Sequence, residues 1–180
     1  MTGWAGLKGL TAFQIGIIVR DMDAAVKANS EVYGVKTWFR SNVKKIDYNY
    51  KGKKRGLELD IVVGYSKGTQ IELIQVLKGE DNLYVELLLK EKLVHSAVCV
   101  RDFDKKISAL KYRGYEELHH GTIFLQGFTK VRFSYFDCRD ELGYVLEVAE
   151  VKSLGLNFGM PKFMLQAARL TGDASLYSVI

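Results

Sequence analysis

Residues 19–23 read VRDMD, and residues 100–104, which lie 81 positions later, read VRDFD. Each copy follows an apolar run typical of a β-strand, 13–19 in the first half of the chain and 94–100 in the second. Each copy also precedes apolar residues at helical spacing. Because four of the five positions are identical and lie at the same strand-to-helix junction, we infer that the chain is a tandem duplication.

The limits of the two expected helices are marked by acids and glycines. Asp21 and Asp102 stand where each helix should begin, and a carboxylate there accepts unpaired amide protons and opposes the helix dipole. Gly34 and Gly114 follow the last periodic residues, as expected for a left-handed C-cap. The sequence therefore predicts one helix after the first strand of each half.

After each helix the sequence changes to runs rich in β-branched and aromatic residues. We expect strands at 36–40, 57–65 and 70–77 in the first half, and at 115–119, 122–125, 131–136 and 145–151 in the second, two of which can be one bent strand. The predicted fold class is α+β, with two tandem β-α-β-β-β modules that form a curved mixed sheet with a shared cleft.

The domain organisation predicted from this repeat is a single domain, 12–150, made of modules 12–78 and 93–150. Residues 1–11 are expected to be an N-terminal extension, and residues 151–180 a C-terminal extension with a short helix that starts near Pro161. The chain has 180 residues, of which 48% are hydrophobic, and this is ample for one core.

The net charge of +5 comes largely from one hairpin-like stretch, 44–55. Its basic residues are Lys44, Lys45, Lys51, Lys53, Lys54 and Arg55. No nucleic-acid-binding motif accompanies this patch, so we predict no nucleic-acid partner. The simplest interpretation is a solvated hairpin, and the second is a binding surface for a phosphate-bearing small molecule.

Nothing in the sequence indicates export or membrane insertion. No apolar run reaches the roughly 18–20 residues that span a bilayer, and the first residues do not resemble a signal peptide. Cys99 and Cys138 lack the spacing of a zinc or redox motif. We therefore expect a cytoplasmic protein with reduced cysteines and no membrane partner.

Four polar side chains interrupt the apolar strands at positions related by the repeat: Gln14, His95, Glu72 and Glu147. Gln14 and His95 open the first strand of each half, and the two glutamates lie inside the last strand of each. Each residue alone has an ordinary explanation, such as an edge-strand amide, a core histidine or a glutamate paired with a lysine. Because a buried carboxylate is costly without a partner, the four together favour a shared divalent cation.

The neighbours of these residues support this interpretation, because side chains two positions apart lie on the same face of a strand. Three of the four polar residues are followed at that distance by small residues, Gly16, Ala97 and Ala149. We expect this space to admit a ligand, whereas bulky residues on the opposite face pack under the helices. Glu72 departs from the pattern, since Ile74 follows it.

These motifs resemble the vicinal oxygen chelate superfamily, which includes glyoxalase I, methylmalonyl-CoA epimerase, extradiol dioxygenases, and fosfomycin- and bleomycin-resistance proteins. The resemblance covers roughly 12–151 and rests on QIGIIVRDMD (14–23), IELIQ (71–75), VH (94–95), FSYFD (133–137) and VLEV (145–148). It implies that the metal-ligand places of the family fall on Gln14, Glu72, His95 and Glu147, a set similar to that of eukaryotic glyoxalase I.

Two departures separate the chain from the epimerases. Val94 stands where the epimerases commonly have a second histidine, and Gly34 is followed by Val35 and not by the usual proline. The resemblance therefore identifies the superfamily and does not identify the reaction.

The ligand types narrow the chemistry. Three oxygen donors and one nitrogen suit zinc, nickel, cobalt, manganese or magnesium acting as a Lewis acid. An iron dioxygenase needs two histidines and one carboxylate. His119 and His120 are the other histidines, and we expect both to be exposed at a strand-to-turn junction. Dioxygenase chemistry is therefore disfavoured.

The function that follows is a metal-dependent lyase or isomerase of the glyoxalase–epimerase type. Glu147 is the expected base beside a metal-bound carbonyl, and Glu72 is its counterpart on the other face of the substrate carbon. The expected substrate is a small α-carbonyl or acyl-thioester compound, including a CoA thioester, and the resemblance implies a homodimer. The alternative is a non-catalytic protein that binds and sequesters a small molecule, as resistance proteins of this superfamily do.

Overall fold

The computed structural model describes residues 11–79, 81–157 and 162–179. The elements are β1 (Ala12–Ile18), α1 (Met22–Tyr33), β2 (Trp38–Ser41), β3 (Val43–Tyr50), β4 (Lys53–Arg55), β5 (Glu58–Ser66), β6 (Thr69–Lys78), the short π-helix η2 (Tyr84–Leu89), β7 (Val94–Cys99), α2 (Phe103–Tyr112), β8 (Glu117–Leu125), β9 (Thr129–Cys138), α3 (Arg139–Leu142), β10 (Tyr144–Ser153), β11 (Leu156–Asn157), α4 (Lys162–Thr171) and β12 (Ala174–Tyr177). None of the helices within these ranges is long and apolar enough to cross a membrane.

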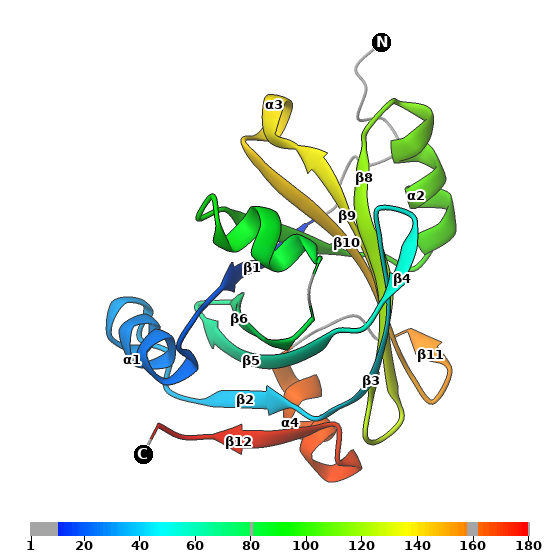
Figure 1. The fold of residues 1–180 in the computed structure, drawn as a ribbon. Helices are drawn as coiled ribbons and strands as arrows, with labels where there is room; N and C mark the ends of the chain where they lie inside the picture. The colour runs from blue at the N-terminus through cyan, green and yellow to red at the C-terminus, as the bar shows by residue number, and fades with distance from the viewer. Residues whose placement is uncertain (1–10, 80, 158–161, 180) are drawn as a thin grey trace.

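The predicted α+β fold with one curved mixed sheet is confirmed (Figure 1). The strand order is β12-β2-β5-β6-β1-β7-β10-β9-β8-β3-β4, with β11 paired to β10. The two first strands, β1 and β7, are antiparallel neighbours at the centre. Each is parallel to the last main strand of its own half, β6 or β10, so the two halves repeat the same arrangement on either side of the centre.

The expected helix boundaries are present, with one difference between the halves. Asp21 caps α1, because its carboxylate accepts a hydrogen bond of 3.0 Å from the amide of Ala24. Gly34 ends this helix with a left-handed φ of 66°, and Gly114 follows α2 with a φ of 85°. Asp102 makes no capping hydrogen bond, and its carboxylate instead lies 3.9 Å from Nζ of Lys106.

The outer, convex face of the sheet is covered by α1 and α2. Most of the bulky strand residues pack there as expected: Ile17 lies in the cluster beneath α1, and Leu146 and Val148 lie in the cluster beneath α2. Ile15 was expected to pack in the same way and is instead 41% exposed. The inner, concave face carries a separate core of large aromatic and aliphatic side chains, among them Tyr48 and Phe133. This inner face is the one that carries the polar site described below.

The basic stretch forms the predicted hairpin, β3–β4, but its position in the sheet was not anticipated. β2 pairs with β5 of the first module, and β3, which follows after Asn42, pairs with β8 of the second module. The nearly continuous segment 38–50 therefore runs from one end of the curved sheet, where β2 lies next to the terminal strand β12, to the other end, where β3 lies next to the terminal strand β4 (Figure 1). The first half thus contains two strands beyond the predicted β-α-β-β-β pattern.

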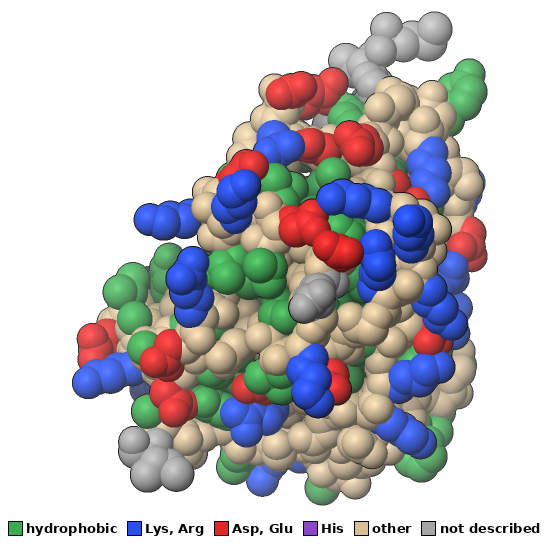
Figure 2. Space-filling model, in the orientation of Figure 1, with side chains coloured by type: hydrophobic (Ala, Val, Ile, Leu, Met, Phe, Trp, Pro, Cys, Tyr) green, Lys and Arg blue, Asp and Glu red, His purple; other side chains and the backbone are tan. Residues whose placement is uncertain are grey.

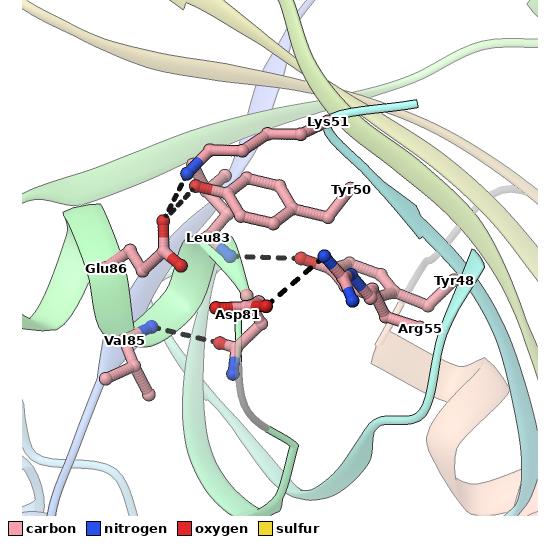
Figure 3. A network of polar contacts seen from close by, with 9 residues as sticks. Tyr48, Tyr50, Lys51, Arg55, Asp81, Leu83, Val85 and Glu86 are labelled. Carbon is pink, nitrogen blue, oxygen red and sulfur yellow. Dashed lines mark hydrogen bonds and ion pairs between the residues drawn. The ribbon is translucent and has the colours of Figure 1, made fainter. Parts of the chain in front are cut away.

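Polar contacts fasten this hairpin to the segment between the modules (Figure 3). Tyr50 donates a hydrogen bond of 2.7 Å to the carboxylate of Glu86, and Nζ of Lys51 lies 2.7 Å from the same group. The hydroxyl of Tyr48 accepts a hydrogen bond of 3.0 Å from the amide of Leu83. The hairpin and η2 therefore hold one another in place beside the concave face.

The C-terminal segment is integrated into the sheet. A helix, α4, occupies 162–171 of the expected extension, and β12 adds a strand beside β2. Asn42, which follows β2, also contacts this segment, because its backbone amide donates a hydrogen bond of 2.8 Å to the carbonyl of Asp173. Pro161, where the helix was expected to start, and residues 1–10 of the expected N-terminal extension lie outside the described residues.

Candidate metal centre

The structure brings the four predicted residues together on four adjacent strands, β6, β1, β7 and β10. Gly16 at the middle of β1 is opposite Glu72 on β6 and opposite His95 on β7. On the next strand, Glu147 of β10 is opposite Ala97, two positions from His95. The pseudo-symmetric pairing of β1 with β7 therefore places residues from both halves of the repeat on one patch of the concave face.

His95 lies between the two carboxylates. Its Nε2 is 3.2 Å from Oε2 of Glu147 and 3.5 Å from Oε2 of Glu72. Potential ligand atoms of the three residues lie within 4.8 Å of one another. Ligand atoms that are each about 2.1 Å from a zinc ion lie roughly 3–3.5 Å apart, and the two distances from Nε2 of His95 fall in this range.

Gln14 completes the set and is fixed by a chain of amides. It is 5% exposed, and its Nε2 donates a hydrogen bond of 2.8 Å to Oε1 of Gln70. Gln70 in turn donates to the hydroxyl of Tyr65 over 2.9 Å. The Gln14 amide also contacts the carboxylate of Glu72. This chain holds the Gln14 side chain in a single orientation beside the carboxylates.

The charges in this cluster shift its protonation. Burial lowers the pKa of His95, but the contacts with the Glu147 and Glu72 carboxylates outweigh burial and raise the pKa to about 9. Burial also raises the pKa of Glu72, and the contact with His95 opposes this change. In the metal-free protein the imidazole is therefore protonated at neutral pH and stabilised by two carboxylates.

The small residue beside the site has a different role from the one expected. The space left by Gly16 was predicted to admit a ligand, and the imidazole of His95 occupies it instead. This space therefore holds the His95 side chain, because β1 and β7 are neighbours and the two residues are opposite one another.

The prediction that His119 is exposed is wrong. His119 is only 2% exposed, because β8 continues through this position as one strand and turns the side chain to the concave face. Neither of its ring nitrogens has a hydrogen-bond partner within the described residues. Burial lowers the pKa of His119 well below its ordinary value. His120, the next residue, is exposed as predicted.

Two tyrosines beside the site were missed from the sequence. The hydroxyl of Tyr135 lies 3.3 Å from Nε2 of His95, and its ring packs edge-on at 4.3 Å against the ring of His119. Tyr84, at the start of η2, packs edge-on against Tyr135 with ring centroids 6.0 Å apart. The alternation of Phe133 and Tyr135 along β9 is a signal that could have placed Tyr135 on the inner face.

The polar cluster opens into a cavity of about 120 Å³ inside the curved sheet. Gln14, Glu72 and Glu147 line one part of this cavity, and Tyr84 and Tyr135 adjoin them. The arrangement can therefore present two carboxylates, an amide and a cation bound between them to a small molecule in the cavity.

Comparisons with known proteins agree with this architecture. The family model described as glyoxalase/bleomycin resistance protein/dioxygenase superfamily matches residues 13–135. A methylmalonyl-CoA epimerase from Mycobacterium tuberculosis is similar in structure, with a TM-score of 0.51 and 17% identity over 78% of this chain and 87% of that one. A hypothetical protein from Bacillus halodurans C-125 is similar with a TM-score of 0.53 and 17% identity over 83% of this chain and 100% of that one.

At these identities the two structures show a shared fold and nothing finer. A search of curated proteins found no match. The family model covers more than half of the chain, and its match includes Gln14, Glu72 and His95. The chain therefore belongs to the glyoxalase/bleomycin resistance protein/dioxygenase superfamily.

Proposed function

We propose that the protein is a divalent-metal-dependent isomerase or lyase of the epimerase–glyoxalase type, which removes a proton from the carbon next to a substrate carbonyl. The observation that carries this proposal is the cluster of Glu72, His95 and Glu147, whose ligand atoms lie within 4.8 Å of one another. The two glutamates of this cluster line a cavity. Membership of the superfamily supports the same class of chemistry.

The residues present fit a divalent cation. Oε2 of Glu147, which lies 3.2 Å from Nε2 of His95, is buried without a well-aligned hydrogen bond from any described residue. Two carboxylates crowded around one imidazole are costly to bury unless a cation is shared among them. We propose Gln14, Glu72, His95 and Glu147 as ligands of zinc, nickel, cobalt, manganese or magnesium. Such an ion, when bound, supplies a Lewis acid that stabilises negative charge on a substrate oxygen.

The two carboxylates are suited to move the proton. Glu147 lies on β10 and Glu72 on β6, so they approach the cavity from opposite sides of the β1–β7 pair. We assign Glu147 as the base that accepts the proton from the substrate carbon. Glu72 lies on the other side of the substrate position and suits the opposite role, because a carboxyl group there can return the proton to the other face of the carbon.

The test is exchange of the substrate α-proton in deuterium oxide, followed by NMR on a panel of α-keto hemithioacetals and 2-methyl acyl-CoA thioesters. Glu147→Gln keeps the length and a neutral oxygen and removes the basic function. It should retain some metal and lose exchange by several orders of magnitude. Unchanged exchange in this variant would rule out Glu147 as the base.

A metal analysis checks the ligand set independently of any substrate. We expect about one divalent ion per chain, none in His95→Ala and weaker binding in Gln14→Ala. A Glu72→Ala/Glu147→Ala double variant that is still fully loaded would contradict the ligand assignment.

The second candidate function is sequestration of a small molecule without turnover. The cavity favours it, because apolar side chains form most of its wall. The exchange experiment separates the two functions, since a binding protein would take up members of the panel and exchange none of them.

A CoA thioester remains one proposed substrate, and the basic hairpin could bind its phosphate groups. Figure 2 shows Lys and Arg side chains gathered over β4 and its neighbours. Two of these cations already have acidic partners, since Lys51 pairs with Glu86 and Arg55 lies 3.2 Å from Asp81 (Figure 3). The hairpin therefore has a structural role, and fewer of its cations are left for a phosphate group.

We also propose a homodimer, because family resemblance favours it and β12 and β4 are the terminal strands of the sheet. Sedimentation at micromolar concentration would show a dimer, and a monomer alone would refute it. The cytoplasmic location stays a prediction from the sequence.

A further inference from the structure

The cavity beside the polar cluster has a mostly apolar wall, and Glu72 and Glu147 form part of that wall. Its volume is about 120 Å³. The part of the wall away from these glutamates is formed largely by aliphatic and aromatic residues, including Ile61, Val63, Ile123, Val131, Phe133 and Ala149. An apolar cavity of comparable size, on the order of 150 Å³, accommodates benzene.

The far wall of the cavity comes from α4, outside the duplicated modules. Met164, Leu165 and Ala168 of this helix line the space, and Leu165 is only 6% exposed. The neighbouring residues on the same helix, Gln166 and Arg169, are exposed. One face of α4 is therefore committed to the cavity and the opposite face to solvent.

The position of α4 is set by a buried carboxylate directly after it. Asp173 is 1% exposed and accepts hydrogen bonds from the amide of Gly127 over 2.9 Å and from Oγ1 of Thr129 over 2.7 Å. It also accepts one of 2.9 Å from Oγ1 of Thr171, the last residue of α4. The helix is thus fastened to the β8–β9 turn and forms a fixed wall.

The charges around the cavity exclude an anionic occupant. No lysine or arginine is among the described residues that line it, whereas Glu72, Glu147 and Asp173 are. A buried anionic group would lose its hydration there and gain no counter-charge away from the metal site.

We propose that this cavity binds an uncharged, apolar group of the substrate, about the size of a phenyl or branched alkyl group, and that α4 sets the upper limit on its size. The inference rests on the proposed function only in taking this group to be the one attached to the reacting carbonyl carbon. It makes α4 the specificity-determining element and Ala168 the residue with the most direct effect, since its side chain is small and lines the cavity.

The first experiment measures binding without catalysis. Toluene is titrated into the complete, metal-loaded protein, and NMR follows the methyl groups of Ile61, Val63, Ile123 and Leu165. We expect saturable shifts at these methyl groups. Ala168→Phe, which fills the cavity, should weaken toluene binding by about tenfold or more. Ala168→Leu provides a smaller obstruction if the larger one disturbs folding.

Arg169→Phe is the matched control, because it adds the same ring to the exposed face of the same helix and should leave binding unchanged. Absence of shifts at the cavity methyl groups, or equal affinity in both Ala168 variants and the wild type, would overturn the inference. Metal content should be the same in all of these proteins.

The second experiment separates this inference from the proposed function. The α-proton exchange panel is extended to hemithioacetals that carry a methyl, isobutyl or phenyl group. The wild type should prefer the two larger groups, and Ala168→Phe should shift the preference toward methyl. Toluene binding without any exchange would refute the proposed chemistry and leave the cavity assignment standing. Exchange that ignores group size would refute the cavity assignment and leave the chemistry standing.

Discussion

The imidazole of His95 lies directly over the backbone of Gly16 on the neighbouring strand, so that a Cβ atom at Gly16 would be 1.9 Å from Nε2. No side chain fits at that distance, and His95 is itself fully buried with carboxylates on two sides. The glycine is therefore required by the histidine.

We predict that Gly16→Ala abolishes metal binding and destabilises the fold by a few kcal/mol, because the imidazole must leave its seat in a tightly packed wall. Metal analysis and urea denaturation measure the two effects. Gly56→Ala is the control, since a Cβ there meets nothing within 4 Å and the backbone needs no positive φ. Normal metal content in Gly16→Ala would show that the ring has another position compatible with binding.

Metal binding should release protons. The pKa of His95 is raised to about 9 in the metal-free protein, so the imidazole is charged at pH 7.5, whereas a metal ligand must be neutral. We expect about one proton to be released per ion and affinity to increase with pH up to about 9. Calorimetric titration in two buffers of different ionisation enthalpy measures the proton count. An identical heat in both buffers would contradict this prediction.

His119 should make the protein less stable in mild acid. Its pKa in the folded protein is well below the ordinary value of 6.5, so the unfolded chain takes up a proton first as the pH falls. This residue therefore leaves the free energy of unfolding almost unchanged well above pH 6.5. At pH 5.5, one unit below the ordinary pKa, it lowers the free energy of unfolding by about 1.4 kcal/mol. His119→Phe keeps an aromatic ring among Tyr84 and Tyr135 and removes the titration.

The measurement compares urea denaturation of the wild type and His119→Phe at pH 7.5 and 5.5. The difference between the two proteins should change by about 1.4 kcal/mol in favour of the variant at the lower pH. His120→Phe serves as the control, because that side chain is exposed. A constant difference between wild type and His119→Phe would mean that the histidine is solvated in solution.

Asp173→Ala should destabilise the protein by about 1–3 kcal/mol, because the partly buried amide of Gly127 and hydroxyl of Thr129 lose their acceptor. Amide hydrogen exchange should increase in α4 and β12 more than in β1 or β7. Asp140→Ala removes an exposed carboxylate and should change stability by less than about 0.5 kcal/mol. Unchanged exchange in α4 would show that the helix is held by packing alone.

The elements that the two halves share could be predicted, because they depend on local sequence signals. The repeated VRD motif marks equivalent strand-to-helix junctions, whereas the antiparallel pairing of β1 with β7 was seen only in the structure. The proximity of the four polar side chains could be predicted for the same reason, since Gln14 and His95 are equivalent by the repeat, as are Glu72 and Glu147.

The rest depends on pairing between distant segments, which leaves no periodic signal. The partner of β3 is β8, more than seventy residues later, and nothing local to Val43–Tyr50 indicates it. His119 was misplaced because separate strands were expected at 115–119 and 122–125, whereas β8 runs without a break through Gly121. There a side chain would collide with the backbone of Asp47, so the glycine permits close approach of β3.

The path of residues 38–50 across both edges of the sheet also constrains how the chain is made. On the ribosome β3 emerges well before β8, so its hydrogen-bonding edge stays unpaired until Glu117–Leu125 has been synthesised. The first module therefore cannot finish folding as an autonomous unit, although the sequence repeat suggests two equivalent halves. The two copies are therefore interlocked, because a strand of the second copy pairs with a strand of the first. Cutting the polypeptide between the two copies would yield two fragments that depend on one another for structure.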